Sequence, residues 1–448
     1  MTNSLDFKHI KGKTKRGLKY IIFKDDNTLS VSIYIMTSAG VIFEKKPGLA
    51  HFTEHVFVGL STKKENKDTR IKNMEIHGIY KNAWTSYETI SYGLDAPYTQ
   101  IDYAFKVLGD DFTQAKFDPK EIEIERNVIK DEIAKSNNNI FANLFNYELS
   151  NFFKKGDPYT HKVLGTAKEL DKITIEDLKE HYKLLNNKNM VIGVSGNVNE
   201  EKVIKLIERF SELLYKSKGK EKEINPKYRT PEYKKPEDIV IKPSKLSKNT
   251  VFAISKIYKE SSKERKLNKK QRLYLAAVND IVINTFAQAQ SSYLWKALRE
   301  NSGLVYGYWF DVWRQENFSL IDLTLDVPKE NVEKVLKKVN EETKKLLKGN
   351  MSKKEVEYWK NYTKNKLMLS TTEHKKILPA LVKSFFYSNY TFTPKELLKA
   401  QEKVKKEDVN KFLKKLKEDI KKEPFVAVFT GNTKGINKSK IRKLIKFT

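Results

Sequence analysis

The sequence predicts an α+β protein with two homologous domains, each a mainly antiparallel sheet packed with helices. Its 448 residues exceed the roughly 100–200 residues of one ordinary domain. Segments rich in β-branched and aromatic residues occur beside segments of helical periodicity. A helix with an acidic start, followed by a buried strand that ends in Gly-Asn, occurs at 174–197 and again at 405–432. This recurrence indicates an internal duplication.

Four segments of the first half carry clear secondary-structure signals. Residues 18–40 predict two strands joined by the turn at 25–27, because β-branched and aromatic residues flank a run of Asp and Asn. A helix is predicted after the Pro47-Gly48 break. A strand is predicted at 82–96, where polar and apolar residues roughly alternate, and a long amphipathic helix at 118–138. This mixture favours antiparallel pairing in the sheet.

A linker separates the two predicted domains. Three prolines interrupt a charged stretch at 216–239 that has no hydrophobic periodicity. We therefore predict an N-terminal domain at 1–220, a linker at 221–236 and a C-terminal domain at 237–448.

The composition excludes several classes of protein. Hydrophobic residues make up 39% and aromatic residues 11% of the chain, which excludes a wholly disordered protein. The sequence has no run of about 20 apolar residues that could span a bilayer, so we expect no membrane partner. The first residues are polar and lack the apolar core of a secretory signal. We therefore expect a cytoplasmic protein.

The net charge of +29 could attract nucleic acid or an anionic surface. Only ten of the 86 basic residues are Arg, however, and the Lys residues are dispersed among Glu. Such a distribution is typical of a solvated surface rather than of a phosphate-binding one. No zinc-finger or RNA-recognition pattern accompanies the charge. We expect no nucleic-acid partner.

The segment 48–60 predicts a metal site. The chain has no Cys, so a metal ion would need His and carboxylate ligands. On a helix, His51 and His55 lie four residues apart on one face, where two imidazoles reach one ion. Glu54 points near the same face and brings a carboxylate beside a metal-bound water, as general-base catalysis needs. The pattern H-x-x-E-H is a zinc-protease motif. The competing interpretation is a pair of ordinary core histidines.

The third protein ligand is expected in the carboxylate-rich helical stretch at 121–136. A catalytic zinc ion usually has three protein ligands and one water. Glu125 and Glu132 are two helical turns apart on one face, so only one of them can contact the ion. The spacing alone leaves the choice between the two open.

The two segments together resemble the pitrilysin, insulysin and mitochondrial processing peptidase family of zinc peptidases. The chain carries His51-Phe-Thr-Glu-His55 followed by the segment 125-ERNVIKDE-132, and it is similar to a short two-domain bacterial member. The resemblance implies that Glu132 is the third zinc ligand. It also implies that Glu125 supports the site without being a ligand.

Two further segments resemble substrate-binding parts of this family. The segment 82-NAWTS-86 resembles a strand whose edge binds an extended substrate, with Asn82 and Ala83 nearest the scissile bond. Strand addition binds many sequences, because main-chain hydrogen bonds do not discriminate between side chains. The segment 294–310 resembles one that supplies a substrate-contacting Arg and Tyr, here Arg299 and Tyr306.

The resemblance implies a zinc-dependent endopeptidase, a hydrolase with one Zn²⁺ per chain. It would hydrolyse extended or unfolded peptides inside a closed chamber, with Glu54 as the general base. One chain carries both the zinc motif and the Arg and Tyr segment, which favours a homodimer, although a heterodimer with a related chain is left open. The alternative is a non-catalytic or partner-dependent subunit of a heterodimeric peptidase of the same fold.

Overall fold

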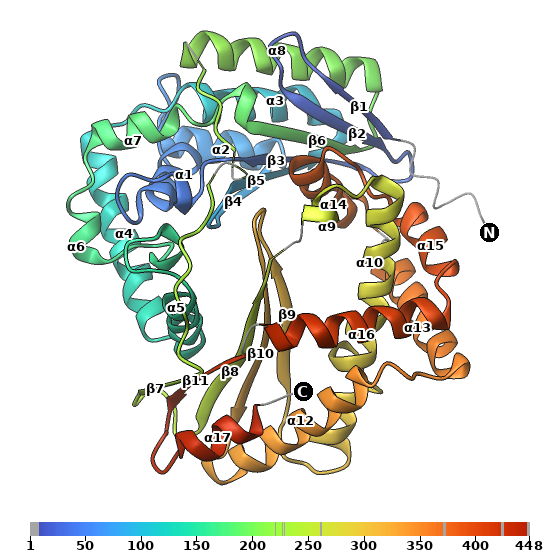
Figure 1. Ribbon diagram of the computed structural model, residues 1–448. Coiled ribbons are helices and arrows are strands. Elements are labelled where there is room, and N and C mark those ends of the chain that lie inside the picture. Colours follow the sequence, from blue (N-terminus) through green and yellow to red (C-terminus); the bar gives the residue numbers. More distant parts are fainter. Residues whose placement is uncertain are drawn as a thin grey trace. The chain divides into compact units, whose positions relative to one another are not determined.

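The computed structural model describes residues 9–219, 221–225, 227, 229–259, 262–370, 373–422 and 425–445. The chain forms two compact units (Figure 1). The first unit comprises residues 1–135, 156–230 and 370–393, and the second comprises residues 136–155, 231–369 and 394–448. Within the described residues, no helix is long and apolar enough to cross a membrane.

The first unit is built on a six-stranded sheet. Its strands, in spatial order, are β1 (His9–Lys13), β2 (Lys19–Lys24), β6 (Met190–Gly196), β3 (Ser30–Thr37), β5 (Ile90–Pro97) and β4 (Tyr80–Thr85). Only β2 and β6 pair in parallel, so the sheet is mainly antiparallel. The two strands predicted within 18–40 are present, but β6 lies between them and they are not hairpin partners.

The strand predicted at 82–96 is two strands in the structure. β4 and β5 form an antiparallel hairpin, and the turn between them is closed by a hydrogen bond from Ser86 N to Thr89 O of 2.7 Å. The turn residues are Ser-Tyr-Glu-Thr and include no Gly or Pro. The usual sequence signals of a hairpin turn are therefore missing.

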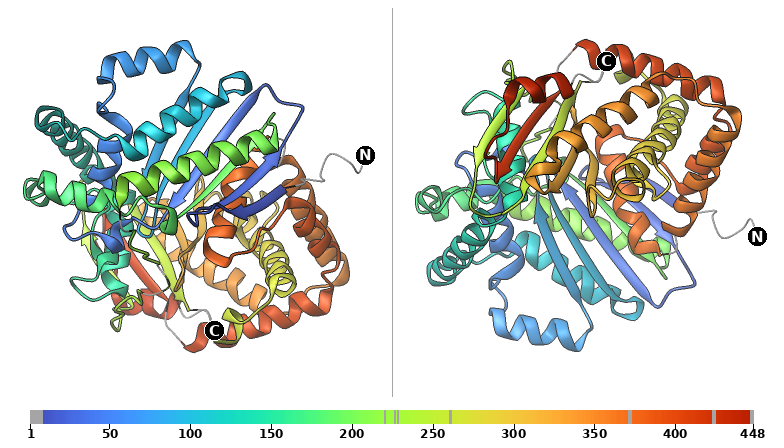
Figure 2. Two further views of the ribbon diagram at one scale, coloured as in Figure 1. Left: turned by 90° about the horizontal axis from the view of Figure 1, so that it is seen from above. Right: turned by 90° about the horizontal axis from the view of Figure 1, so that it is seen from below.

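Helices cover both faces of the first sheet. They are α1 (Leu49–Gly59), α2 (Lys67–Ile76), α3 (Ile101–Thr113), α4 (Pro119–Asn137), α6 (Ala167–Leu170), α7 (Ile175–Tyr182), α8 (Glu200–Lys218) and α14 (His374–Ser388). Side chains of alternating strand positions enter two different cores. Ile22 packs with α3 and α8 on one face, whereas Ile21 packs with α14 on the other. Figure 2 shows α8 crossing the first of these faces.

The second unit repeats this architecture. Its five strands, in spatial order, are β7 (Ile239–Pro243), β11 (Val426–Gly431), β8 (Thr250–Tyr258), β10 (Ser319–Val327) and β9 (Tyr308–Arg314). Only β7 and β11 pair in parallel. Counted along the chain, the five strands take the same spatial order as β2 to β6 do in the first unit. The predicted α+β fold with two homologous domains is confirmed.

The helices of the second unit follow in a corresponding order along the chain. They are α5 (Ile140–Phe152), α9 (Ser262–Arg265), α10 (Lys269–Ile283), α11 (Tyr293–Trp295), α12 (Val332–Leu347), α13 (Lys353–Ser370), α15 (Pro394–Glu402), α16 (Lys406–Lys422) and α17 (Lys438–Leu444). The apolar faces of α12 and α17 pack against the sheet, as those of α3 and α8 do in the first unit.

The two halves of the chain exchange one helix each. α5 comes from the first half but packs on β8 and β11 of the second unit, whereas α14 comes from the second half and packs on β3 and β6 of the first. These strands occupy equivalent positions in the two sheets. The compact units therefore differ from the contiguous stretches 1–220 and 237–448 by this exchange.

The predicted linker at 221–236 is bound to the structure along its described residues. Lys222 O accepts hydrogen bonds from the side-chain amides of Asn186 and Asn189 in the first unit. In the second unit, Lys234 N donates to Phe152 O over 3.0 Å. These bonds satisfy backbone groups that a Pro-rich segment cannot pair with itself.

Candidate functional site

Helix α1 begins at a close contact between two glycines. Gly48 has φ +87° and precedes the helix, and a Cβ atom there would come within 2.8 Å of Leu164 O. Gly165 has φ +67°, and a Cβ atom there would come within 2.8 Å of Pro47 O. Only glycine fits this backbone conformation and this approach without strain. The contact fixes the start of the helix that carries His51, Glu54 and His55.

His51, His55 and Glu132 come together on the facing sides of α1 and α4. One ligand atom from each lies within 4.8 Å of the others. Glu132 Oε2 is 3.7 Å from His51 Nε2 and 3.6 Å from His55 Nε2. Tetrahedral ligands held about 2.0–2.1 Å from zinc are roughly 3.4 Å apart. The donor set and its spacing therefore fit a zinc ion with small adjustments of the side chains.

Glu125 contacts the His55 ring on the side opposite to Glu132. Glu125 Oε1 lies 2.9 Å from His55 Nδ1, and Lys67 Nζ lies 3.7 Å from Glu125 Oε2. The hydrogen bond with His55 lowers the pKa of Glu125. A proton held at Nδ1 by this carboxylate leaves the Nε2 lone pair of His55 for a metal ion. Glu125 therefore lies at Nδ1 of His55, whereas Glu132 lies near its Nε2.

The two histidines have different surroundings. Burial and the neighbouring His55 lower the pKa of His51 to about 4. Burial also lowers the pKa of His55, but hydrogen bonds with Glu125 and Glu132 outweigh it and raise the pKa to about 9. His51 Nδ1 is buried and has no hydrogen-bond partner among the residues that the structure describes. Of the two rings, that of His55 alone has a carboxylate at its Nδ1 atom among the described residues.

Glu54 lies next to this set without belonging to it. Its side chain is 9% exposed, and Thr85 on β4 donates a hydrogen bond of 2.6 Å to Glu54 Oε2. Burial raises the pKa of Glu54, and the bond from Thr85 opposes that rise. Sequence reasoning did not single out Thr85. The available signal was the strand alternation, which puts Thr85 on the same face as Ala83.

The predicted substrate-binding residues Asn82 and Ala83 lie on β4, the edge strand of the first sheet. They pair with Gly93 and Tyr92 of β5, so the other side of β4 carries no strand within this unit. Asn82 is exposed and its Oδ1 accepts a hydrogen bond of 3.0 Å from Ala83 N. An edge of this kind offers backbone groups to an extended peptide.

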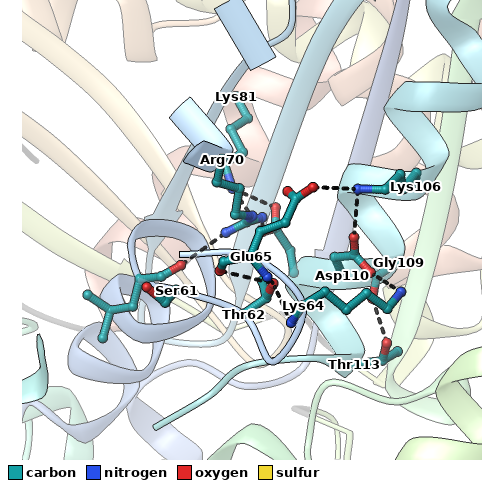
Figure 3. A network of polar contacts seen from close by, with 12 residues as sticks. Ser61, Thr62, Lys64, Glu65, Arg70, Lys81, Lys106, Gly109, Asp110 and Thr113 are labelled. Carbon is teal, nitrogen blue, oxygen red and sulfur yellow. Dashed lines mark hydrogen bonds and ion pairs between the residues drawn. The ribbon is translucent and has the colours of Figure 1, made fainter. Parts of the chain in front are cut away.

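A buried charged network joins β4 to the end of α1, and Figure 3 shows its residues Lys81 and Arg70 within a wider set of polar contacts. Lys81 Nζ on β4 donates to Asp111 over 2.8 Å, and Arg70 on α2 also pairs with Asp111. Arg70 Nη1 donates to Leu60 O, directly after α1, over 3.1 Å. The Tyr92 hydroxyl also donates to the Asp111 carboxylate, over 2.7 Å. Because buried charges persist only when paired, this network fixes the strand and the helix to one core.

The predicted Arg299 and Tyr306 lie in the second unit and contact each other. The Arg299 guanidinium donates to Tyr306 O and lies 4.9 Å from the ring centroid of Trp295 and 4.6 Å from that of Tyr306. Gly303, with φ +57°, allows the turn between them. Tyr306 is 87% exposed. A phenol and a guanidinium at a solvent-exposed turn are available to a ligand.

A cavity of about 250 Å³ lies in the second unit between the sheet and helices α10, α12 and α16. Its lining is mostly apolar, and neither Arg299 nor Tyr306 belongs to it. The group of potential metal ligands lies in the first unit. The cavity is therefore not part of the candidate site.

Comparisons with known proteins relate both halves of the chain to one family. Residues 20–167 match the family model described as Insulinase (Peptidase family M16). Residues 172–362 match the model described as Peptidase M16 inactive domain. The candidate metal ligands and Glu54 all lie within the first match, whereas Arg299 and Tyr306 lie within the second.

Curated relatives and solved structures agree with this assignment. An uncharacterized zinc protease of Rickettsia felis is 31% identical over 209 residues, which are 45% of this chain and 49% of the relative, so the match spans about half of that protein. The beta subunit of the mitochondrial-processing peptidase of Saccharomyces cerevisiae is 23% identical over 410 residues, covering 89% of this chain and 86% of the subunit. A protease from Helicobacter pylori shares the fold, with a TM-score of 0.80, 19% identity and coverage of 95% and 99% of the two chains.

Proposed function

The chain belongs to the M16 family of peptidases, and from this membership we propose that it is a zinc-dependent endopeptidase acting on extended or unfolded peptides. The observation that carries the proposal is the convergence of His51, His55 and Glu132, with Glu54 beside them. This combination supplies three ligands for a zinc ion and one carboxylate that is free to move a proton.

Each residue of the site has a chemical task in this proposal. His51, His55 and Glu132 would hold the zinc ion, which when bound supplies a Lewis acid that activates water and polarises a carbonyl. Glu54 would accept a proton from the attacking water and pass it to the leaving amine. Its burial supports this task, because a raised pKa brings a carboxylate closer to the pH at which it must both take and release a proton.

The substrate would bind as an added strand along the edge of β4, near Asn82 and Ala83. Backbone hydrogen bonds would supply affinity without selecting side chains, which suits a peptidase for unfolded peptides. Arg299 and Tyr306 would donate hydrogen bonds to the substrate. Since one chain carries all of these residues, we expect a homodimer that encloses a chamber, and size measurements in solution test that expectation.

The test is hydrolysis of a set of quenched fluorescent peptides by the purified protein, before and after zinc removal with a chelator. We expect cleavage that stops on chelation and returns with zinc. Glu54→Gln should keep its zinc but lose about 10²- to 10⁴-fold in turnover, the usual contribution of a general base. His51→Ala and Glu132→Gln should lose the zinc itself.

Glu123→Gln is the matched control for these substitutions. Glu123 lies on the same helix as Glu132, is exposed and pairs with Arg126. Its variant should keep both zinc and activity. Full peptide cleavage by the Glu54→Gln protein would exclude the assigned mechanism.

The alternative function is a non-catalytic or partner-dependent subunit of a heterodimeric peptidase. Two observations favour keeping it: residues 172–362 match a model described as an inactive domain, and the yeast relative is named as a subunit. Zinc-loaded protein that cleaves no peptide would support this alternative. The intact ligand set and Glu54 favour the peptidase.

A further inference from the structure

The two oxygens of the Glu54 carboxylate have different surroundings. Oε2 accepts the hydrogen bond of 2.6 Å from the Thr85 hydroxyl. No protein donor to Oε1 is recorded among the described residues. A buried carboxylate with one oxygen bonded and the other open has a defined orientation, which a carboxylate without a donor lacks.

We propose that Thr85 is the positioning residue of the general base. Its hydroxyl holds Glu54 Oε2, so that Oε1 is presented to the water that attacks the substrate. The inference rests on the proposed peptidase function and adds a residue to it. Thr85 itself touches neither the reacting atoms nor the metal ligands in this arrangement; it acts through Glu54.

Thr85 is well suited to hold another side chain still. Threonine is β-branched, so its χ1 angle is restricted and its hydroxyl direction is limited. Thr85 pairs with Ile90 of β5 at the last position of β4. Together with Lys81 and Ala83 it lies on one face of the strand, since every second side chain points the same way. β4 packs against α1, the helix that carries Glu54.

The buried pairs of Lys81 and Arg70 with Asp111 keep this strand and helix together. Lys81, four residues before Thr85 on the same strand face, pairs with the buried Asp111. Arg70 pairs with Asp111 and donates to Leu60 O after the end of α1. The distance between β4 and α1 is thereby set by groups that cannot leave the core without exposing an unpaired charge. The Thr85–Glu54 bond forms within that fixed frame.

A purely structural role for Thr85 makes a different prediction. A partly buried hydroxyl is usually hydrogen-bonded, and the Glu54 carboxylate would satisfy that of Thr85 whether or not catalysis occurred. Loss of the hydroxyl would then lower stability or zinc content but leave the turnover of each folded, zinc-loaded molecule unchanged. A positioning role predicts the opposite result.

The experiment compares Thr85→Val, which removes the hydroxyl and keeps the shape, with Thr85→Ser, which keeps the hydroxyl. Activity is normalised to bound zinc. We expect kcat of the valine variant to fall by up to about 100-fold with KM unchanged, because a displacement of about 1 Å of a catalytic group has that effect. The serine variant should recover most of the loss. Thr113→Val is the control, since Thr113 is buried in the same unit and its hydroxyl donates a hydrogen bond of 2.6 Å to Gly109 O.

A second measurement does not depend on turnover. A phosphinic peptide imitates the tetrahedral transition state, and its binding to zinc-loaded protein is followed by fluorescence. We expect Thr85→Val to weaken this binding by the same factor as kcat, because both depend on where Glu54 lies. The affinity of Thr113→Val should equal that of the wild type.

The outcomes separate the two proposals. An active wild type whose valine variant keeps its kcat per zinc and its phosphinic affinity overturns the role of Thr85 and leaves the peptidase function standing. A zinc-loaded wild type that neither cleaves peptides nor binds the phosphinic peptide overturns both.

Discussion

Glu125 orients His55 from the side of the ring that faces away from Glu132. Its carboxylate lies 2.9 Å from His55 Nδ1 and is buried beside Lys67. No corresponding carboxylate contacts the buried His51 Nδ1 among the residues that the structure describes. The orientation of the whole ligand set therefore depends on Glu125 more than it would in a site where both rings are held.

Glu125→Gln should weaken zinc binding about 10- to 100-fold, the usual effect of removing a carboxylate behind a ligand histidine. The amide keeps the size of the side chain but loses the charge that favours a proton at Nδ1. Zinc affinity is measured by competition with a chromophoric chelator. Glu123→Gln on the same helix should bind zinc as the wild type does. An unchanged affinity of the Glu125 variant would show that the hydrogen bond has no part in metal binding.

Residue spacing alone predicts this site only where its residues are close along the chain, whereas Glu132 and Glu125 were assigned through the resemblance to the peptidase family. His51, Glu54 and His55 lie within one helical segment, so their spacing alone places them on neighbouring faces. Thr85 and Asp111 reach the same region from a strand and from another helix. Their roles depend on which helix packs against which strand, and single-sequence patterns do not contain that information.

At the level of single elements, α5 is bound to the second sheet by aromatic and carboxyl side chains. Phe141 lies edge-to-face against Trp309 of β9, and Phe145 against Trp313. Further along the same helix, the buried Glu148 meets Asp322 of β10. Burial raises the pKa of Glu148 well above its ordinary value, and Asp322 raises it further.

This pair makes stability depend on pH. Burial also raises the pKa of Asp322 to about 6. In this pH range Glu148 keeps its proton in the folded chain but has lost it in the unfolded chain. The folded chain therefore binds more protons than the unfolded chain. Its free energy of unfolding therefore decreases as the pH rises above about 4.5, the ordinary pKa of Glu. The decrease continues until the pH reaches the folded pKa.

Glu148→Gln should remove most of this dependence, because an amide has no proton to lose and can donate to Asp322. Relative to the wild type, the variant should become more stable between pH 5 and pH 8, by up to roughly 1 kcal/mol per pH unit. Urea unfolding at the two pH values measures the difference. Glu330→Gln, at an exposed position of the same unit, should show the pH dependence of the wild type. Equal pH dependence in the Glu148 variant would contradict the raised pKa.

Element boundaries were predictable where the local chemistry marks them. The helix predicted at 118–138 is α4, and the helix predicted after Pro47-Gly48 is α1. The hairpin of β4 and β5 was missed, because its turn is held by buried Tyr87 and Glu88 rather than by Gly or Pro. The backbone conformation of this turn therefore depends on tertiary contacts rather than on local sequence signals.

At the level of the whole molecule, the sequence predicts the duplication but not the exchange of helices. α5 and α14 each carry an apolar face, and that pattern predicts burial of the face without specifying the sheet that covers it. In the structure, the α14 side chains Ile377, Leu378, Leu381 and Val382 pack on the first sheet. A Cβ atom at Gly193 of β6 would come within 2.4 Å of Val382, so the contact there is close.

The exchange predicts that a cut between the two halves leaves them associated. A specific protease site inserted between Arg229 and Thr230, both exposed, separates the chain into two fragments. Each fragment contains a helix that belongs to the unit of the other. Burial of the apolar side chains of α14 alone contributes on the order of 10 kcal/mol, so the cut protein should elute as one species in size-exclusion chromatography and separate only in denaturant.

Val382→Asp tests whether the exchanged helix is responsible. A charge in the α14 contact lacks a partner and opposes burial, so the fragments of this variant should separate after cleavage under native conditions. Leu29→Asp is the control, because Leu29 is 79% exposed in the first unit and the same charge there costs little. If the wild-type fragments separate on cleavage as readily as those of Val382→Asp, the packing of α14 on the first sheet does not join the halves. If the fragments of both Val382→Asp and Leu29→Asp stay associated after cleavage, contacts other than that of Val382 hold the two fragments together.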